Sequence, residues 1–418
     1  MSVLNIIVLH GILPKSIFYI LYTHFKQFIM SKIIEEIISI MLISCLFSCS
    51  NKQNIHGLEN AYYIDLNNSN VEKINADKVI SSVKYIKLET KNDNFIGIIT
   101  NIIFLDEKIL IADKIISKSI YFFDYDGKFI KKIGGIGQGP NEYVDICHIT
   151  LSNDNNEILV IDDSKSQILH YNLEGNYLQS SPLLYRAENI EYIDQNNIAY
   201  YNTPGIYKGY KENLKNTLLV SDLDCQVNYS LFANNQDSWF NFTTHADHLR
   251  KYNKSIYVTP NLSDTIYQVY PEGLQIRYIL NGDKRPEINK TIVTQDYIDF
   301  TSNHRCFNGN FVKTNDYSIF GIYPHGSYPL FFTDKTKKAY QIKDKSAEPS
   351  LRFFNEGYIM TSYQDNILVT DVQANTILED YQDNPTLFKQ SPFLTKLVDS
   401  LYEEDNPILF FYTLNSEL

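Results

Sequence analysis

The chain has 418 residues, 44% of them hydrophobic and 14% aromatic, so it is long and apolar enough to bury a large core. Its formal net charge is −12 at pH 7 and it contains no run of Lys or Arg, which argues against a nucleic-acid partner. The 32 Tyr and 24 Phe favour strands.

The N-terminal segment, residues 1–29, is not expected to belong to the folded domain. Residues 1–29 are apolar but are interrupted by Gly11 and Pro14, which makes them a poor membrane span. We interpret them as a mis-called extension that precedes the true start at Met30.

A second signal-like segment follows at residues 30–48. Its apolar stretch, Ile37 to Phe47, has the length of a signal-peptide core and is too short to cross a bilayer. The stretch ends in Leu-Phe-Ser-Cys, which resembles a bacterial lipobox, and we expect Cys49 to carry a lipid. A plain secretory signal or an uncleaved anchor is the alternative. Residues 49–60 are polar and are predicted to form a tether.

A repeat is the most informative feature of the chain. Lys108–Ile130 and Glu157–Leu178 share one pattern: a β-rich stretch ending in Asp, a polar turn, a second β-rich stretch and an acidic-Gly turn. A period near 50 residues built from short strands indicates a β-propeller. The corresponding positions are Asp113 with Asp162 and Gly127 with Gly175.

Several acidic positions near strand ends are predicted to form turns. Asp113, Asp162 and Asp264 are expected to start turns by bonding their side chains to the backbone. The run Asn153–Glu157 is too short for an EF-hand loop and lacks its Gly, so it is interpreted as a hairpin turn.

The glycine-rich run Gly134–Tyr143 lies between the two repeats. A phosphate cradle would require a third Gly where Pro140 stands, or a Lys-Ser/Thr pair, and a helix after the run. None of these is present in the sequence pattern. We therefore interpret the run as a tight crossing from one blade to the next.

More strands are expected along the rest of the chain, with an insertion at residues 203–216 and a long loop or extra hairpin around residues 228–249. The expected strand regions are Val83–Glu89, Ile190–Asn202, Leu218–Leu223, Ser255–Thr259, Phe311–Tyr323, Pro329–Ile342, Phe353–Ser362 and Asn366–Thr370.

The C-terminal region predicts one helix and a last strand. Ser391 suits an N-cap and Pro392 the first turn of an amphipathic helix of about three turns. The strand Ile408–Leu414 is expected to close the propeller ring by pairing with a strand from the other end of the chain.

Several of these pieces together resemble the six-bladed β-propeller lipoproteins of Bacteroidetes, relatives of NHL-repeat propellers. The resemblance covers roughly Ser82 to Leu418 and implies an all-β, six-bladed propeller over residues 61–418, with the short helix before the closing strand. It also implies an outer-membrane setting in the cell envelope, and it identifies no active site. The matching segments are Tyr85–Thr90, Phe123–Phe129, Gly137–Tyr143, Asp264–Tyr267 and Asn406-Pro407 with the strand that follows.

The three Cys of the expected domain make no disulfide framework. Cys147, Cys225 and Cys306 are scattered and are predicted to be buried hydrophobes. Cys147 precedes His148, but neighbouring strand residues point to opposite faces, which argues against a catalytic pair.

The segment His245-Ala246-Asp247-His248 is the only His cluster. It offers two imidazoles and a carboxylate to a metal, but it lacks the helix or the Cys partners of known zinc patterns, so a solvated loop is preferred. With Trp239 and Phe240, His245 and His248 are candidate ligand-binding residues, because the aromatic rings can stack on a sugar or a peptide. The alternative is that these rings cap the core of a blade.

Two functions follow from this reading. The first is a lipid-anchored binding or scaffold module for a glycan, a peptide or an envelope protein, in contact with the membrane through its lipid alone. The second is a metal-dependent hydrolase or lyase with its site on the propeller axis, which rests on analogy between folds. We expect no catalytic residues, no metal ligands and no cofactor, with calcium as the one candidate ion.

Overall fold

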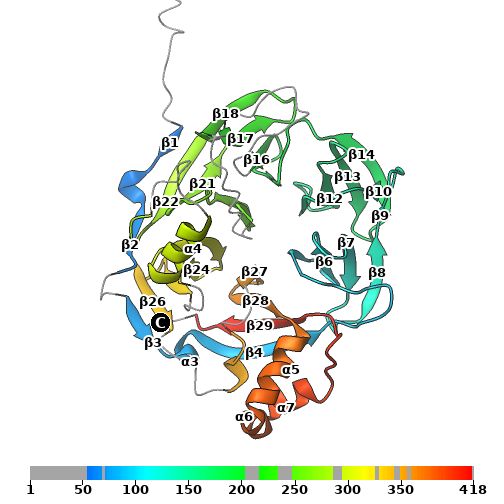
Figure 1. Cartoon of the computed structure of the whole chain (residues 1–418). Coiled ribbons are helices and arrows are strands. Elements are labelled where there is room, and N and C mark those ends of the chain that lie inside the picture. The colour runs from blue at the N-terminus through cyan, green and yellow to red at the C-terminus, as the bar shows by residue number, and fades with distance from the viewer. Residues whose placement is uncertain are drawn as a thin grey trace, which may run out of the picture. The chain divides into compact units, whose positions relative to one another are not determined.

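The computed structural model describes residues 54–67, 71–202, 216–233, 247–285, 294–324, 329–342, 349–354 and 359–416. Residues 54–418 form one compact unit, in which six sheets follow one another around a central axis (Figure 1). The expected six-bladed β-propeller is confirmed.

The first three blades are four-stranded meanders. Blade 1 consists of β5 (Asn101–Phe104), β6 (Ile109–Asp113), β7 (Ser119–Phe123) and β8 (Phe129–Ile133). Blade 2 consists of β11 (His148–Leu151), β12 (Glu157–Asp162), β13 (Gln167–Asn172) and β14 (Tyr177–Pro182). Blade 3 consists of β15 (Asn189–Tyr192), β16 (Asn197–Tyr201), β17 (Asn216–Asp222) and β18 (Val227–Ala233).

The other three blades incorporate strands from the N-terminal part of the described chain. Blade 4 consists of β19 (Leu249–Tyr252), β20 (Ser255–Val258), β21 (Thr265–Tyr270) and β22 (Gly273–Asn281), edged by β1 (Ile55–His56) and β2 (Tyr62–Asp65). Blade 5 consists of β23 (Phe307–Lys313), β24 (Tyr317–Ile322), β25 (Leu330–Thr333) and β26 (Lys338–Ile342), edged by β3 (Glu72–Ile74). Blade 6 consists of β27 (Ile359–Tyr363), β28 (Ile367–Val372), β29 (Ile408–Leu414) and β4 (Ile80–Lys87).

The core lies between adjacent blades, which explains why the middle strands are apolar at consecutive positions. Alternate residues of β6 face different neighbours: Leu110 packs in a cluster with residues of blade 2, whereas Ile111 packs in a cluster with residues of blade 6. Because both faces of the sheet are covered, all five residues of β6 are buried.

The predicted turn Asp residues of blades 1 and 2 are confirmed. Asp113 accepts hydrogen bonds from the backbone N–H groups of Ile116, at 2.8 Å, and of Gly97, at 2.9 Å, so it starts a turn and also holds the segment that enters the blade. Asp162 likewise accepts hydrogen bonds from the backbone N–H groups of Lys165, at 3.1 Å, and of Val144, at 2.8 Å.

The prediction that Asp264 starts a turn is wrong. Its carboxylate forms an ion pair with Arg285 at 2.9 Å, while the hydroxyl of Ser263 accepts the hydrogen bond from Thr265 N at 3.0 Å. In this blade the side-chain bond that starts the turn is therefore made by Ser263, one position before Asp264.

The repeated turn glycines have backbones that favour Gly. Gly127 has φ of 82° and Gly175 has φ of 73°. A Cβ at Gly127 would also stand 2.1 Å from the backbone oxygen of Lys87 in β4, so the turn of blade 1 packs directly against blade 6.

The glycine-rich run between blades 1 and 2 is a crossing, as predicted. It contains the short parallel pair β9 (Gly135–Ile136) and β10 (Glu142–Tyr143). The Glu142 carboxylate accepts a hydrogen bond from Gly139 N at 2.7 Å, and the Lys165 ammonium donates to the Gly139 carbonyl at 3.1 Å. The loop is thus held by its own Glu and by a Lys from the following blade.

The ring closes as the sequence indicated. β29, near the C-terminus, pairs antiparallel with β28 on one side and with β4 on the other, so blade 6 combines three strands from the end of the chain with one from its beginning. Asn406, just before β29, is fully buried, and its side chain bonds to Ile96 N, Glu89 O and Asn94 O at 2.8 to 3.1 Å. This Asn therefore fastens the two ends together.

The N-terminal strands form a feature that the sequence did not reveal. β1 and β2 pair parallel with β22, and β3 pairs parallel with β26, so these three strands cover the outer edges of blades 4 and 5. We call residues 55–74 the strap. The last six positions of the expected tether, residues 49–60, therefore contain structure: Ile55 and His56 pair in the sheet, and a 3-10 turn follows at Leu58–Asn60.

Helices occupy the connections. α7 (Pro392–Val398) begins as predicted, with Leu394 N donating to the Ser391 hydroxyl at 3.3 Å, although it is shorter than expected. The helices that were not predicted are α3 (Ala76–Val79), α4 (Thr294–Asn303), α5 (Ala374–Asp383) and α6 (Pro385–Gln390), together with the 3-10 turns η1 (Leu58–Asn60) and η2 (Pro349–Leu351).

The two faces of the ring differ. Antiparallel order places the turns after the first and third strands of a blade on one face, which we call the hairpin face. The crossings between blades, α4 and the α5–α7 insertion lie on the other, which we call the helix face. The first strand of each blade runs along the axis between them.

Candidate functional site

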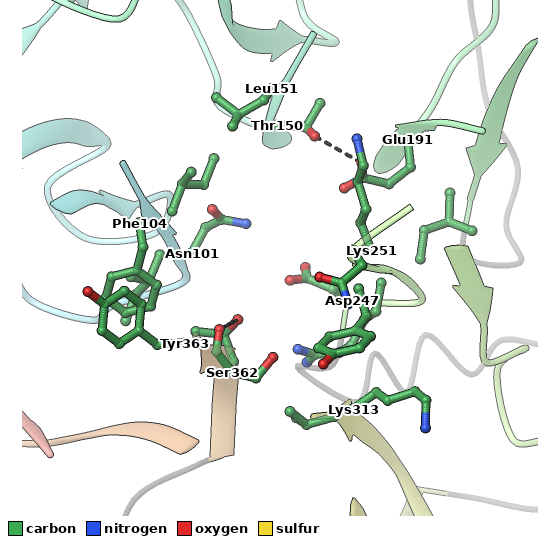
Figure 2. Close-up of a pocket in the computed structure, with 18 of the residues that line it drawn as sticks. Asn101, Phe104, Thr150, Leu151, Glu191, Asp247, Lys251, Lys313, Ser362 and Tyr363 are labelled. Carbon is green, nitrogen blue, oxygen red and sulfur yellow. Dashed lines mark hydrogen bonds between the residues drawn. The ribbon is translucent and has the colours of Figure 1, made fainter. Parts of the chain in front are cut away.

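A cavity of about 550 Å³ lies along the axis of the ring, lined by the first strands of all six blades. Its residues reach the hairpin face at Asn155, Asn253 and Asp365, in turns of three different blades. Figure 2 shows that the labelled polar and apolar side chains lie mainly on opposite sides of the cavity.

Blades 2 and 3 supply a buried polar cluster. His148, at the start of β11, is 2% exposed, and Glu191, in β15, is 6% exposed. One Glu191 oxygen accepts a hydrogen bond from the Thr150 hydroxyl at 3.0 Å, and the other lies 3.5 Å from His148 Nε2. The Asn189 amide donates to His148 Nδ1 at 3.3 Å, so Thr150 and Asn189 hold this carboxylate and imidazole in place.

Asp247 and Arg250 extend the polar side at blade 4. Burial tends to raise the pKa of the Asp247 carboxyl, but the positive charges of Lys114 and Arg250 outweigh it, so the pKa lies below its usual range. The Arg250 guanidinium donates to the Asn310 side chain at 3.3 Å. The cavity therefore has an ionised carboxylate and a guanidinium at its polar side.

The opposite side, formed by blades 1, 2 and 6, carries the apolar part of the lining, together with Asn101 and Ser362 (Figure 2). It contains Ile103, Phe104, Leu151 and Tyr363. The Phe104 and Tyr363 rings have centroids 4.5 Å apart, and both also pack against Phe411 at 5.9 and 5.8 Å. These rings are thus held by other rings of the core as well as by each other.

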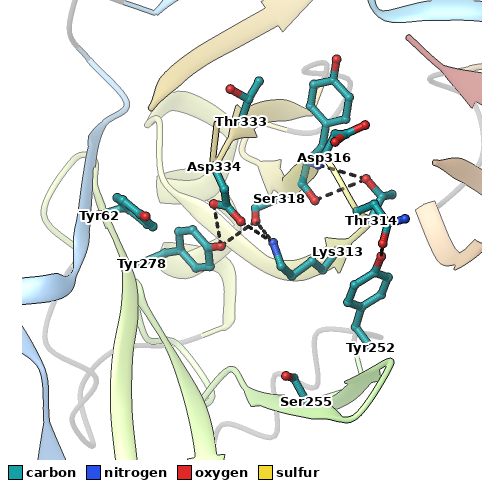
Figure 3. Close-up of polar contacts among 12 residues, drawn as sticks. Tyr62, Tyr252, Ser255, Tyr278, Lys313, Thr314, Asp316, Ser318, Thr333 and Asp334 are labelled. Carbon is teal, nitrogen blue, oxygen red and sulfur yellow. Dashed lines mark hydrogen bonds and ion pairs between the residues drawn. The ribbon is translucent and has the colours of Figure 1, made fainter. Parts of the chain in front are cut away.

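A second polar network lies at the interface of blades 4 and 5 (Figure 3). Lys313 forms an ion pair with Asp334 at 2.7 Å and donates to the Ser318 hydroxyl at 3.1 Å, and Ser318 in turn donates to Tyr278 at 2.7 Å. Ser318 and Tyr278 are fully buried. The network therefore stabilises the interface, and the charge of Lys313 is already balanced where it borders the cavity.

Of the predicted site residues, His248 alone lies in the described part of the chain. Cys49, Trp239, Phe240 and His245 lie outside the described residues. His248 corrects the prediction of a solvated loop: it is 5% exposed, stacks on Tyr201 at a centroid distance of 4.5 Å and donates from Nδ1 to the Thr259 carbonyl at 2.7 Å. Burial lowers its pKa.

Residues that the sequence did not single out form the cavity instead. The main ones are Phe104, Glu191, Arg250, Lys251 and Tyr363. The sequence carried a signal for some of them, because Glu191 and the Arg250-Lys251 pair are charged residues flanked by apolar or aromatic residues of the same strand. What the sequence did not indicate is which strand of each blade lies next to the axis.

The three Cys residues of the propeller and its acidic and His side chains bear on the predicted thiol chemistry and metal binding. Cys147, Cys225 and Cys306 are free, and burial raises the pKa of Cys147 to about 12. Among the described residues, no group of three His, Cys, Asp or Glu side chains could hold a metal ion. Nor does any described helix combine the length and the hydrophobicity needed to cross a membrane.

The fold and the cavity together define a six-bladed β-propeller with an axial cavity. The chain belongs to the DUF4934 family, described as a domain of unknown function, whose model matches residues 61–413. No curated protein matches the sequence.

Two solved structures share the architecture. A Bacteroides fragilis protein described as exported is 19% identical, with a TM-score of 0.68, over 85% of this chain and 99% of that chain. A DUF4221 family member from Bacteroides vulgatus is 12% identical, with a TM-score of 0.49, over 81% of this chain and 97% of that chain. The first of these similarities supports the fold.

Proposed function

We propose that this chain is an exported binding module whose ligand site is the axial cavity. The observation that carries the proposal is the two-sided lining, with Glu191, Asp247 and Lys251 facing Phe104 and Tyr363 across the axis (Figure 2). A volume of about 550 Å³ lies within the usual range for ligand sites, and such sites combine an apolar lining with a few fixed polar groups.

The binding proposal is tested by filling the cavity. Ser362 lies in β27 beside the axis, so Ser362→Trp places an indole in the cavity (Figure 2). Pools of short peptides and of oligosaccharides are added to the full chain in detergent while its thermal unfolding is followed. We expect at least one pool to raise the Tm of the wild type through linkage and to leave Ser362→Trp unchanged.

A matched control is Ser82→Trp, because Ser82 is exposed on β4, the outermost strand of blade 6. It should respond to the same pool as the wild type. A pool that stabilises all three proteins equally would show that binding occurs elsewhere, and the axial proposal would be wrong.

We further propose that the protein is a lipoprotein of the cell envelope, anchored through Cys49 in the outer membrane. The support is the Leu-Phe-Ser-Cys sequence at residues 46–49, and the similarity to a Bacteroides fragilis protein described as exported. In cells labelled with radioactive palmitate, the wild type should carry label in the membrane fraction. Cys49→Ser should lose the label, and retention of label by this variant would contradict the proposal.

A further inference from the structure

We infer that the axial cavity selects a short peptide with a free carboxylate and an apolar side chain beside it. The inference rests on the proposed binding function and goes beyond it by naming the ligand class. It depends on three properties of the lining: the balance of its charges, the packing of its rings and its size.

Among the described charged side chains of the lining, one has no hydrogen-bond or charged partner. Asp365 accepts a hydrogen bond from the Asn315 amide at 2.6 Å. Glu191 has His148 and Thr150 as neighbours, and Lys313 has Asp334. Asp247 lies in the positive field of Lys114 and Arg250. By contrast, the ammonium of Lys251, in β19, has no hydrogen bond or ion pair to any described residue.

Lys251 extends into the cavity on the same side as Glu191 (Figure 2). A half-buried ammonium on the wall of a cavity gains from an anion that replaces the water it loses. The carboxylates nearby already have hydrogen-bond donors, so they do not need a further donor from a ligand. The partner that the Lys251 ammonium lacks is therefore a negatively charged group. A ligand carboxylate satisfies this requirement.

The apolar side decides between a peptide and a glycan. A sugar ring stacks on an aromatic face that is free, whereas Phe104 and Tyr363 pack on each other at 4.5 Å and are bordered by Phe411. Ile103 and Leu151 complete this side with branched aliphatic groups. Such a surface suits an apolar amino-acid side chain better than a hydroxylated ring.

The size of the cavity agrees with this ligand. A volume of about 550 Å³ has room for a peptide of roughly two to four residues. With its carboxylate at Lys251, the last side chain of the peptide reaches the apolar side, and its amide N–H groups face Glu191 and Asp247. The C-terminal residue is therefore the main specificity determinant.

The test uses calorimetry on the detergent-solubilised full chain with a tripeptide library of the form Gly-Xaa-Xaa, in which the last residue is Leu, Ile, Phe or Met. Each peptide is compared with its C-terminal amide. We expect binding of the free acids and at least a tenfold weaker affinity for the amides. Lys251→Met should remove the difference between acid and amide, while Lys84→Met, on the exposed outer strand β4, should keep it.

The outcomes separate this inference from the proposed function. Equal affinity for acids and amides, or an unchanged preference in Lys251→Met, would overturn the carboxylate assignment. Binding of maltotriose or of a galacturonic acid trisaccharide that is lost in Ser362→Trp, with no tripeptide bound, would overturn the peptide assignment and still support axial binding. Failure of every tripeptide to bind would likewise overturn the inference, because the library covers the apolar C-terminal residues that it requires.

Discussion

At the scale of single residues, one repeat position has two opposite electrostatic environments. The sequence Ile-Leu-Ile-Ala-Asp ends at Asp113 in blade 1, and Ile-Leu-Val-Thr-Asp ends at Asp371 in blade 6. Burial tends to raise the pKa of Asp113, but hydrogen bonds from backbone N–H groups, beginning with that of Ser117, outweigh it and lower the pKa. For Asp371, burial dominates and raises the pKa to about 7.

This contrast predicts opposite pH dependences for the two Asn variants. The folded state holds the Asp371 proton more tightly than the unfolded state, so this residue costs stability as pH rises from about 4 to about 7. Asp371→Asn should therefore raise the Tm at pH 8 relative to the wild type and lose this advantage at pH 4. Asp113→Asn serves as the control and should lower the Tm above pH 4, with the difference shrinking as pH falls. A constant difference for Asp371→Asn across this range would contradict the assignment.

At the scale of elements, Asn406 connects the loop after β4 to the start of β29. Its buried side chain makes three hydrogen bonds to backbone groups of residues 89–96. Asn406→Ala leaves these groups without partners, and we expect a loss of about 2–4 kcal/mol in the free energy of unfolding. Asn415 also bonds to backbone carbonyls of another element, those of Asp77 and Lys78, but it does so at the surface.

Asn415→Ala is therefore the matched control for Asn406→Ala, with an expected loss of about 1 kcal/mol or less. Urea unfolding followed by circular dichroism measures both. If the two variants lose the same stability, the fastening role assigned to Asn406 is wrong.

Elements that depend on local patterns were predictable from the sequence, and those that depend on distant pairing were not. The Asp-ended strands, the Gly127 turn and the Ser391 N-cap each follow from a few neighbouring residues. The strap, residues 55–74, pairs with strands about 200 or more positions away and carries no alternating pattern long enough to indicate a strand. The cavity was not predictable for the same reason, because Phe104 and Tyr363 are far apart in the sequence and meet only in the closed ring.

At the scale of the whole molecule, the ring depends on β4 more than on the strap. β4 pairs with β29 along seven residues and contributes Ile80 to the core, with Val83 and Tyr85 packed against it. The strap adds outer edges to blades 4 and 5 and contributes Ile64, Leu66 and Val71 to the core between them, but it takes no part in closing the ring. Removing the strap should therefore lower stability and leave a closed ring, whereas removing β4 as well exposes the edge of β29 to pairing with other chains.

We compare two shortened chains that begin at Asn75 and at Leu88, purified without the lipid-bearing segment. The first should unfold in one cooperative step in urea and remain monodisperse. The second should lose cooperative unfolding and scatter light, because blade 6 then lacks its outer strand and the interblade core on that side is open to water. Equal urea midpoints and equal light scattering for the two would show that the ring does not need β4 for closure.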